Sequence, residues 1–81
     1  MTTWRQILSW RVVKEFRIGA RVNLVASWNP QRFPDGSAGT IIDGPHLETQ
    51  GVAWQVKMDS GERSGMTGID PYFYEYQMEL L

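Results

Sequence analysis

The sequence predicts a mostly β fold of the α+β class: a small five-stranded barrel with one short N-terminal helix. Two observations support this fold class. From Phe16 onward, short runs of β-branched and aromatic residues are separated by turns rich in glycine and proline. Before Phe16, apolar residues recur at the three- and four-residue spacing of a helix face. Closure into a barrel would remove the exposed edges that short strands otherwise leave.

The length of the chain, 81 residues, suffices for one domain and is too short for two. We divide this single domain into an N-terminal helical arm at residues 1–15 and a barrel at residues 16–81. Hydrophobic residues make up 42% of the chain and the formal net charge is -1, which disfavours intrinsic disorder. There is no cysteine, and the one histidine, His46, cannot assemble a zinc site alone. We therefore expect no metal and no cofactor.

The sequence contains no apolar run near the roughly 18 residues that a membrane span requires. Its N-terminus also lacks the basic, apolar and small-residue regions of a signal peptide. We expect a cytoplasmic, soluble protein without a membrane partner, present as a monomer or a small homo-oligomer.

The N-terminal helix is predicted at residues 4–13. Thr3 and Gln6 match a capping box, in which each side chain satisfies a free backbone N–H of the other. The apolar residues that would share one helix face are Trp4, Ile7, Leu8 and Val12. Residues 10–16 also alternate between apolar and charged side chains, so helix and strand both remain open for them.

The first strand is predicted at residues 21–26, where polar and apolar residues alternate after Gly19. Residues 27–38 contain two prolines and a glycine. Proline cannot donate to a central ladder, so this segment predicts a long loop. The second strand is predicted at residues 39–43 and would end at the following Gly-Pro pair.

The clearest strand is predicted at residues 52–58, where alternate side chains are apolar and would share one face. Residues 59–61, Asp-Ser-Gly, predict a tight hairpin because glycine accepts a positive φ. The fourth strand would then begin near Glu62. A turn at residues 72–76 would lead into a terminal strand at residues 78–81.

Residues 65–74 read Gly-Met-Thr-Gly-Ile-Asp-Pro-Tyr-Phe-Tyr. This segment resembles the Gly-x-x-Gly-apolar-x-Pro-x-x-Tyr stretch with which Src-homology 3 (SH3) domains leave their fourth strand, make a 3₁₀ turn and enter the fifth. Over residues 16–81 the order of segments is similar to the wider set of SH3-like barrels, which includes translation-factor-like modules, accessory subunits and type II dihydrofolate reductases. The resemblance implies a five-stranded SH3-like barrel, a fold that hosts many functions.

In SH3-like barrels the long loop and the late turn face each other across a shallow groove. The resemblance therefore implies a partner-binding set of five residues: Trp28, Phe33, Pro71, Tyr72 and Tyr74. Asp35 and Glu75 would lie at the rim. Tyrosine and tryptophan are enriched in binding hot spots because they offer large contact area at small entropic cost. We predict a non-enzymatic protein-binding module or accessory subunit with a protein partner.

A core role is the alternative for several of these rings, because a small barrel needs large side chains to fill it. Trp54 and Phe73 are predicted to be core residues, and Phe33 is open between core and groove. Tyr72 and Tyr74 are equally open between the two positions.

Charge is distributed unevenly along the chain. Residues 22–81 carry three basic residues against eight carboxylates, whereas residues 1–21 carry five basic residues against one glutamate. We call the five basic residues of this stretch the basic arm: Arg5, Arg11, Lys14, Arg17 and Arg21. The arm either folds back on the acidic body or docks an acidic partner or phosphates. Weak nucleic-acid binding through the arm is therefore the alternative function, because the acidic body would repel a polyanion.

Catalytic motifs are missing from the sequence, which has neither a phosphate-binding glycine loop before a helix nor a nucleophile elbow. His46 is predicted to be a surface or turn residue. Four aspartates occupy expected turns, where aspartate commonly accepts hydrogen bonds from nearby backbone N–H groups: Asp35, Asp43, Asp59 and Asp70. A type II reductase would need a Val-Gln-Ile-Tyr-Pro cofactor segment that residues 66–71 do not match. We predict no enzyme activity, and small-molecule binding or reductase activity of an oligomeric barrel is the less favoured alternative.

Overall fold

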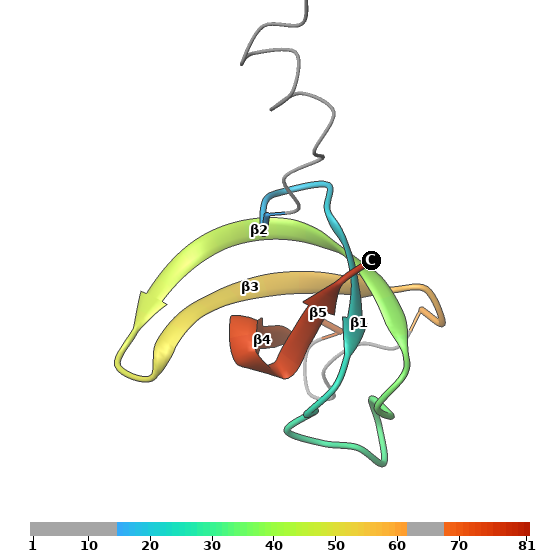
Figure 1. Ribbon diagram of the computed structural model, residues 1–81. Coiled ribbons are helices and arrows are strands. Elements are labelled where there is room, and N and C mark those ends of the chain that lie inside the picture. Colours follow the sequence, from blue (N-terminus) through green and yellow to red (C-terminus); the bar gives the residue numbers. More distant parts are fainter. Residues whose placement is uncertain (1–14, 62–67) are drawn as a thin grey trace, which may run out of the picture.

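The computed structural model describes residues 15–61 and 68–81 (Figure 1). The elements in chain order are β1 (Arg21–Leu24), β2 (Ala38–Glu48), β3 (Gly51–Met58), β4 (Tyr72–Tyr74), the 3₁₀ turn η1 (Glu75–Gln77) and β5 (Met78–Leu80). These described ranges contain no α-helix. The helix predicted at residues 4–13 and the strand predicted to begin near Glu62 lie outside them.

The five strands form one antiparallel sheet in the order β4-β3-β2-β1-β5. The strands β4 and β5 follow each other in the chain through η1, yet they form the two edges of the sheet. Figure 1 shows that β2 and β3 curve strongly over β4, η1 and β5. The predicted mostly β fold with five strands is confirmed. The described strands form an open curved sheet, in which no ladder joins β4 to β5.

The strand β2 corrects one prediction, because it does not end at Gly44 and Pro45 but continues to Glu48. Its pairing with β3 is irregular on both sides of Asp43, which is the signature of bulged strands. The ladder between β1 and β2 ends at Thr40. Beyond Thr40, β3 is the strand that pairs with β2 among the described residues. An irregular strand with one free side tolerates a proline.

Gly44 fits this bulge for a steric reason. Its φ is +129°, a region that residues with a side chain rarely adopt. A Cβ atom at this position would lie 2.7 Å from Cε3 of Trp54. The glycine therefore lets the backbone of β2 approach the indole ring of β3 directly.

The segment Tyr72–Tyr74 corrects a second prediction, because it forms β4 rather than a turn and pairs with residues 53–55 of β3. Phe73 is buried between two more exposed tyrosines, which is the two-residue period of a strand. The 3₁₀ turn accordingly occupies Glu75–Gln77 instead of following Pro71 directly.

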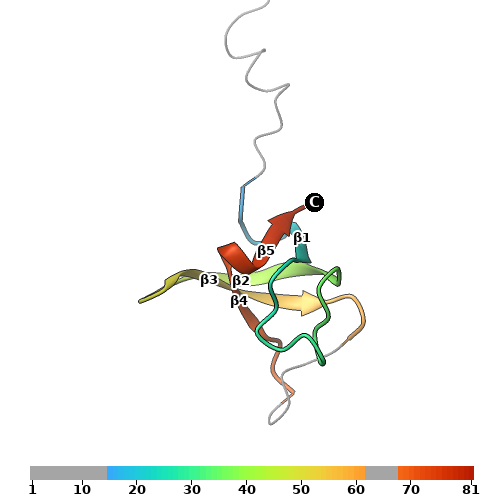
Figure 2. The same ribbon diagram turned by 60° about the horizontal axis from the view of Figure 1, so that its bottom comes forward.

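The hydrophobic core receives side chains from all five strands and Phe33 from the long loop. Its buried members are Val22, Leu24, Phe33, Ile41, Trp54, Val56, Met58, Phe73 and Met78. The prediction for residues 52–58 is confirmed for Trp54, Val56 and Met58, although Val52 is only partly buried. The terminal strand is also confirmed, while the first strand ends at Leu24 and the long loop covers residues 25–37. In Figure 2 this loop lies on the same side of the β2–β3 hairpin as β4.

Candidate functional site

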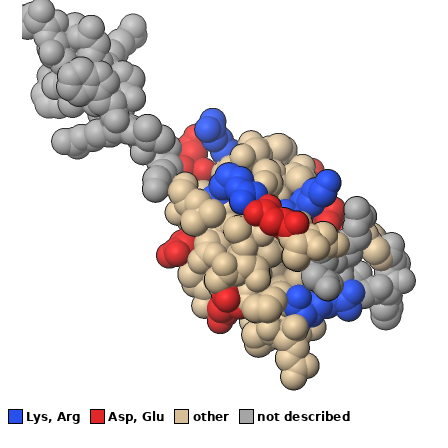
Figure 3. All heavy atoms as spheres, turned by 90° about the vertical axis from the view of Figure 1, so that its right-hand side faces the viewer, with Lys and Arg blue, Asp and Glu red and all other residues tan. Residues whose placement is uncertain are grey.

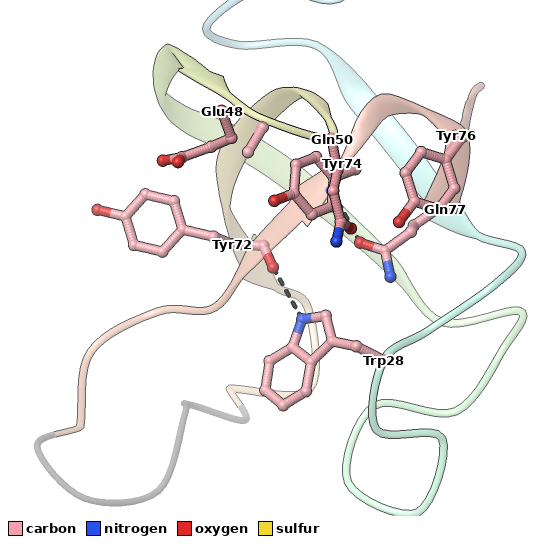
Figure 4. A pocket seen from close by; sticks show the side chains of 8 residues that line it. Trp28, Glu48, Gln50, Tyr72, Tyr74, Tyr76 and Gln77 are labelled. Carbon is pink, nitrogen blue, oxygen red and sulfur yellow. Dashed lines mark hydrogen bonds between the residues drawn. The ribbon is translucent and has the colours of Figure 1, made fainter.

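A cavity of about 290 Å³ opens between the long loop and the strands β3 and β4. The residues that line it are Trp28, Glu48, Gln50, Ala53, Tyr72, Tyr74, Tyr76 and Gln77 (Figure 4). Small-molecule pockets typically occupy roughly 300–1,000 Å³. This cavity lies just below that range and therefore suits one side chain of a partner.

Trp28 forms the side of the cavity that the long loop contributes. Its indole Nε1 donates a hydrogen bond to the carbonyl oxygen of Tyr72 at 2.8 Å (Figure 4). The indole ring packs edge-on against Phe33 at 5.3 Å between centroids and is tilted over Phe73 at 5.8 Å. The Trp28 residue nevertheless stays 49% exposed. The protein thus fixes the ring from one side and leaves the other side open to a partner.

Three tyrosines form the opposite side of the cavity. Tyr72 and Tyr74 share one face of β4, because alternate residues of a strand point the same way. Tyr76, in η1, stacks on Tyr74 with ring centroids 5.4 Å apart and ring planes only 9° from parallel. Tyr72 and Tyr76 are 44% and 61% exposed. Together the rings make an aromatic surface that is open to solvent.

Gln77 holds the two sides of the cavity together. Its side-chain oxygen accepts a hydrogen bond from the backbone N–H of Tyr74 at 2.8 Å. Its carbonyl oxygen accepts the N–H groups of Val25 and Ala26, where the long loop begins, at 2.9 and 3.2 Å. Gln77 is a buried polar residue, 6% exposed, so these bonds are shielded from water. One residue therefore positions β4, η1 and the loop that carries Trp28.

A second hydrogen bond fixes η1 against β3. The indole Nε1 of the buried Trp54 donates to Oε2 of Glu75 at 2.8 Å. Because Glu75 lies between Tyr74 and Tyr76, this contact also orients the stacked tyrosine pair.

The cavity has a negative character. Glu48, at the end of β2, is the charged residue among the described residues that line it, and no lysine, arginine or histidine accompanies it there. The faces of aromatic rings carry partial negative charge. The cavity thus combines apolar area with an electrostatic preference for positive groups.

The structure brings three of the five predicted groove residues to the cavity, namely Trp28, Tyr72 and Tyr74. It places Phe33, 1% exposed, and Pro71, also fully buried, in the interior, which corrects their assignment to the groove. The small body needs the Phe33 ring to fill its core, and Pro71 lies where the chain enters β4.

The two acids expected at the rim are engaged elsewhere. Asp35 accepts the backbone N–H of Ser27 at 2.8 Å within the long loop, and Glu75 accepts the indole of Trp54. Neither residue lines the cavity.

Sequence reasoning missed Glu48, Gln50, Ala53, Tyr76 and Gln77 as lining residues. Glu48 and Gln50 reach the cavity because the β2–β3 hairpin extends to its tip, whereas the sequence indicated a loop there. Tyr76 carried a usable signal, since it continues the every-second-residue spacing of the other two tyrosines.

Three residues of the predicted basic arm, Arg5, Arg11 and Lys14, lie outside the described residues. Arg17 is exposed. Arg21 pairs with the carboxylate of Asp59 through two hydrogen bonds of 2.6 and 2.5 Å and also contacts Thr40. These hydrogen bonds raise the pKa of Arg21 and lower the pKa of Asp59.

One residue of the basic arm, Arg21, is therefore already bound to the barrel region of residues 16–81. Figure 3 shows the same mixing more widely on one face, where basic and acidic side chains lie next to one another instead of forming a single-sign patch.

His46 lies in β2 and not in a loop, with Nε2 3.1 Å from Oδ2 of Asp43 and its ring 5.0 Å from that of Tyr72. Across the described ranges, no three His, Cys, Asp or Glu side chains are grouped to hold a metal ion. No helix within these ranges has the length and apolar character to cross a membrane.

Comparisons of the chain with protein-family models, curated proteins and solved structures gave no match.

Proposed function

We propose that this protein is a non-enzymatic protein-binding module or accessory subunit whose aromatic cavity receives a side chain of a protein partner. The observation that carries this proposal is the convergence of four aromatic residues from the long loop, β4 and η1, each with accessible ring surface: Trp28, Tyr72, Tyr74 and Tyr76. Hydrogen bonds and ring contacts hold these residues in place before a partner arrives. Preorganised rings lose little entropy on binding, so more of the contact energy appears as affinity.

The cavity's chemistry supports binding over catalysis. Its described lining offers one carboxylate, two amides and three phenols, and it includes no serine, threonine, cysteine or histidine that would serve as a nucleophile or general base.

The proposal extends to the fold and the setting of the protein. We propose that the curved sheet is an SH3-like barrel, because β5 pairs with β1 and a 3₁₀ turn links β4 to β5, as the resemblance implies. We also propose that it acts in the cytoplasm, where disulfides are rare, since the chain has no cysteine. We further propose that it is a monomer or a small homo-oligomer.

Affinity capture from a lysate of the source cells tests the proposed function. The binding variant replaces Tyr72 and Tyr76 by alanine, because both rings are well exposed and their loss leaves the core intact. We expect the wild-type protein to retain a partner that the double variant loses at least tenfold, as exposed hot-spot tyrosines commonly account for that much affinity.

The matched control is Ile18→Ala, which removes an exposed apolar side chain, 59% exposed, outside the cavity. This variant should capture the partner as well as the wild type does. Thermal melting of all three proteins checks that each remains folded. Equal capture by the folded double variant and the wild type would contradict the proposal.

A further inference from the structure

The charge around the cavity favours a positively charged ligand. Glu48 contributes a carboxylate to the lining, and the described residues as a whole carry eight acidic against four basic side chains. Without the ion pair between Arg21 and Asp59, seven acidic side chains remain against three basic ones. An anionic group would enter against this field, whereas a cationic group would be attracted to it.

The aromatic residues also favour a positively charged ligand. Cations are attracted to the face of a tryptophan or tyrosine ring, and the attraction grows as water is displaced. Trp28, Tyr72 and Tyr76 keep between 44% and 61% of their surface accessible, so ring area remains for such a contact. Figure 4 shows Glu48 and Tyr72 on one side of the cavity and Tyr76 on the other.

The combination of flat rings and a carboxylate favours guanidinium over ammonium. A guanidinium group is planar, stacks on aromatic faces and donates two parallel hydrogen bonds to a carboxylate at the same time. A lysine ammonium is compact and strongly hydrated, so it lacks the flat surface that stacking requires. A volume of about 290 Å³ suits one such side chain.

We propose that the cavity recognises an arginine side chain in a basic segment of the partner protein, with the guanidinium stacked on the aromatic rings and paired with Glu48. This inference rests on the proposed function and names the chemistry of its partner.

A titration of the full-length, ¹⁵N-labelled protein followed by NMR tests the inference. The probes are three capped pentapeptides in which arginine, citrulline or lysine is flanked by glycines. Citrulline is the informative control, because it keeps the shape of arginine and removes its charge. Peptide concentrations should reach about 5 mM, since one anchored side chain is expected to bind near the millimolar range.

We expect the arginine peptide to shift the indole N–H signal of Trp28 and the amide signals of Tyr72 and Tyr76. The citrulline peptide should bind at least about tenfold more weakly, and the lysine peptide about threefold more weakly. Glu48→Gln should weaken arginine binding about tenfold and leave citrulline binding unchanged. The matched variant Glu79→Gln, which neutralises an exposed acid of β5 outside the cavity, should bind arginine like the wild type.

Four results would overturn the inference: equal binding of arginine and citrulline, equal binding of arginine and lysine, no effect of Glu48→Gln, or no shift at the cavity with about 5 mM arginine peptide. Its failure differs from failure of the proposed function. If the captured partner still depends on Tyr72 and Tyr76, but not on Glu48, the binding module stands and only arginine recognition is wrong. If capture is independent of the two tyrosines, the proposed function itself is wrong.

Discussion

Trp28 packs against the core and lines the cavity at once. Its ring contacts Phe33 and Phe73, and its indole N–H is bonded to the backbone of β4. Removing the ring would therefore disturb folding as well as binding. Tyr72 and Tyr76 are better reporters of binding, because their rings pack on His46 and Tyr74, which lie outside the buried core cluster.

At Gly44 the fold requires the absence of a side chain for two reasons, a positive φ and a close approach to Trp54. Gly44→Ala would impose a Cβ atom 2.7 Å from the Trp54 ring at a φ of +129°. We expect the free energy of unfolding to fall by about 2–4 kcal/mol, because backbone strain and overpacking add. Urea denaturation followed by circular dichroism measures this change.

Gly36→Ala is the matched control for this prediction. Gly36 also has a positive φ, +91°, but nothing lies within 4 Å of a Cβ atom there. Only the backbone cost of about 1 kcal/mol should appear. Equal destabilisation by the two substitutions would show that contact with Trp54 does not matter.

At the scale of elements, the sequence predicted the strands whose apolar pattern is unambiguous. Alternation identified β3, and the prolines of the long loop excluded a strand there. The continuation of β2 past Pro45 was not predictable, because a proline ends a strand unless a bulge and a free side accommodate it. Those conditions depend on which strands become neighbours.

The same reason limits what the sequence says about the cavity. The aromatic residues Trp28, Tyr72 and Tyr74 stand out by type, and the structure places all three in the lining of the cavity. Glu48 and Gln50 have no distinguishing local pattern, and they reach the cavity only through the pairing of β2 with β3. Phe33 and Tyr72 look alike in sequence, and tertiary packing alone makes one buried and the other exposed.

The ion pair between Arg21 of β1 and Asp59, just after β3, makes a pH-dependent link between elements. Because the hydrogen bonds from Arg21 lower the pKa of Asp59 in the folded state, the pair stabilises the fold above the ordinary carboxyl pKa of about 3.9. That contribution is lost as the pH falls through the folded pKa. Asp59→Asn should therefore lower the melting temperature slightly at pH 7.

The difference between Asp59→Asn and the wild type should shrink below about pH 4 and vanish once Asp59 is protonated in both states. Melting temperatures measured from pH 7 to pH 2 check this, with Glu79→Gln as a control for general loss of charge. The effect should be small, because both partners are exposed to solvent. A difference that grows as the pH falls would refute the assignment of the pair.

At the scale of the whole molecule, the arm and the body differ in charge, which bears on nucleic-acid binding as the alternative function. Because Arg21 is held by Asp59, the arm would supply three or four phosphate contacts. The logarithm of the binding constant should then fall with the logarithm of salt concentration at a slope of roughly -2 to -3 for a single strand. We expect weak binding of a single-stranded oligonucleotide at low salt and its loss at about 150 mM. Fluorescence anisotropy measures both.

Replacing Arg5, Arg11 and Lys14 by glutamine should remove the low-salt binding, whereas Arg32→Gln, in the long loop of the body, should leave it nearly intact. Submicromolar affinity at about 150 mM salt would make nucleic-acid binding the leading function.

The hydrogen bond from Trp28 to Tyr72 joins positions 44 residues apart in the chain. Neither side of the cavity exists as a local structure, since each depends on the other and on Gln77 between them. A partner that enters the cavity therefore binds the folded chain and has no counterpart in the unfolded one. Mass action then makes the partner a folding ligand: at about one hundred times its dissociation constant it would add about 2.7 kcal/mol to the stability of the fold.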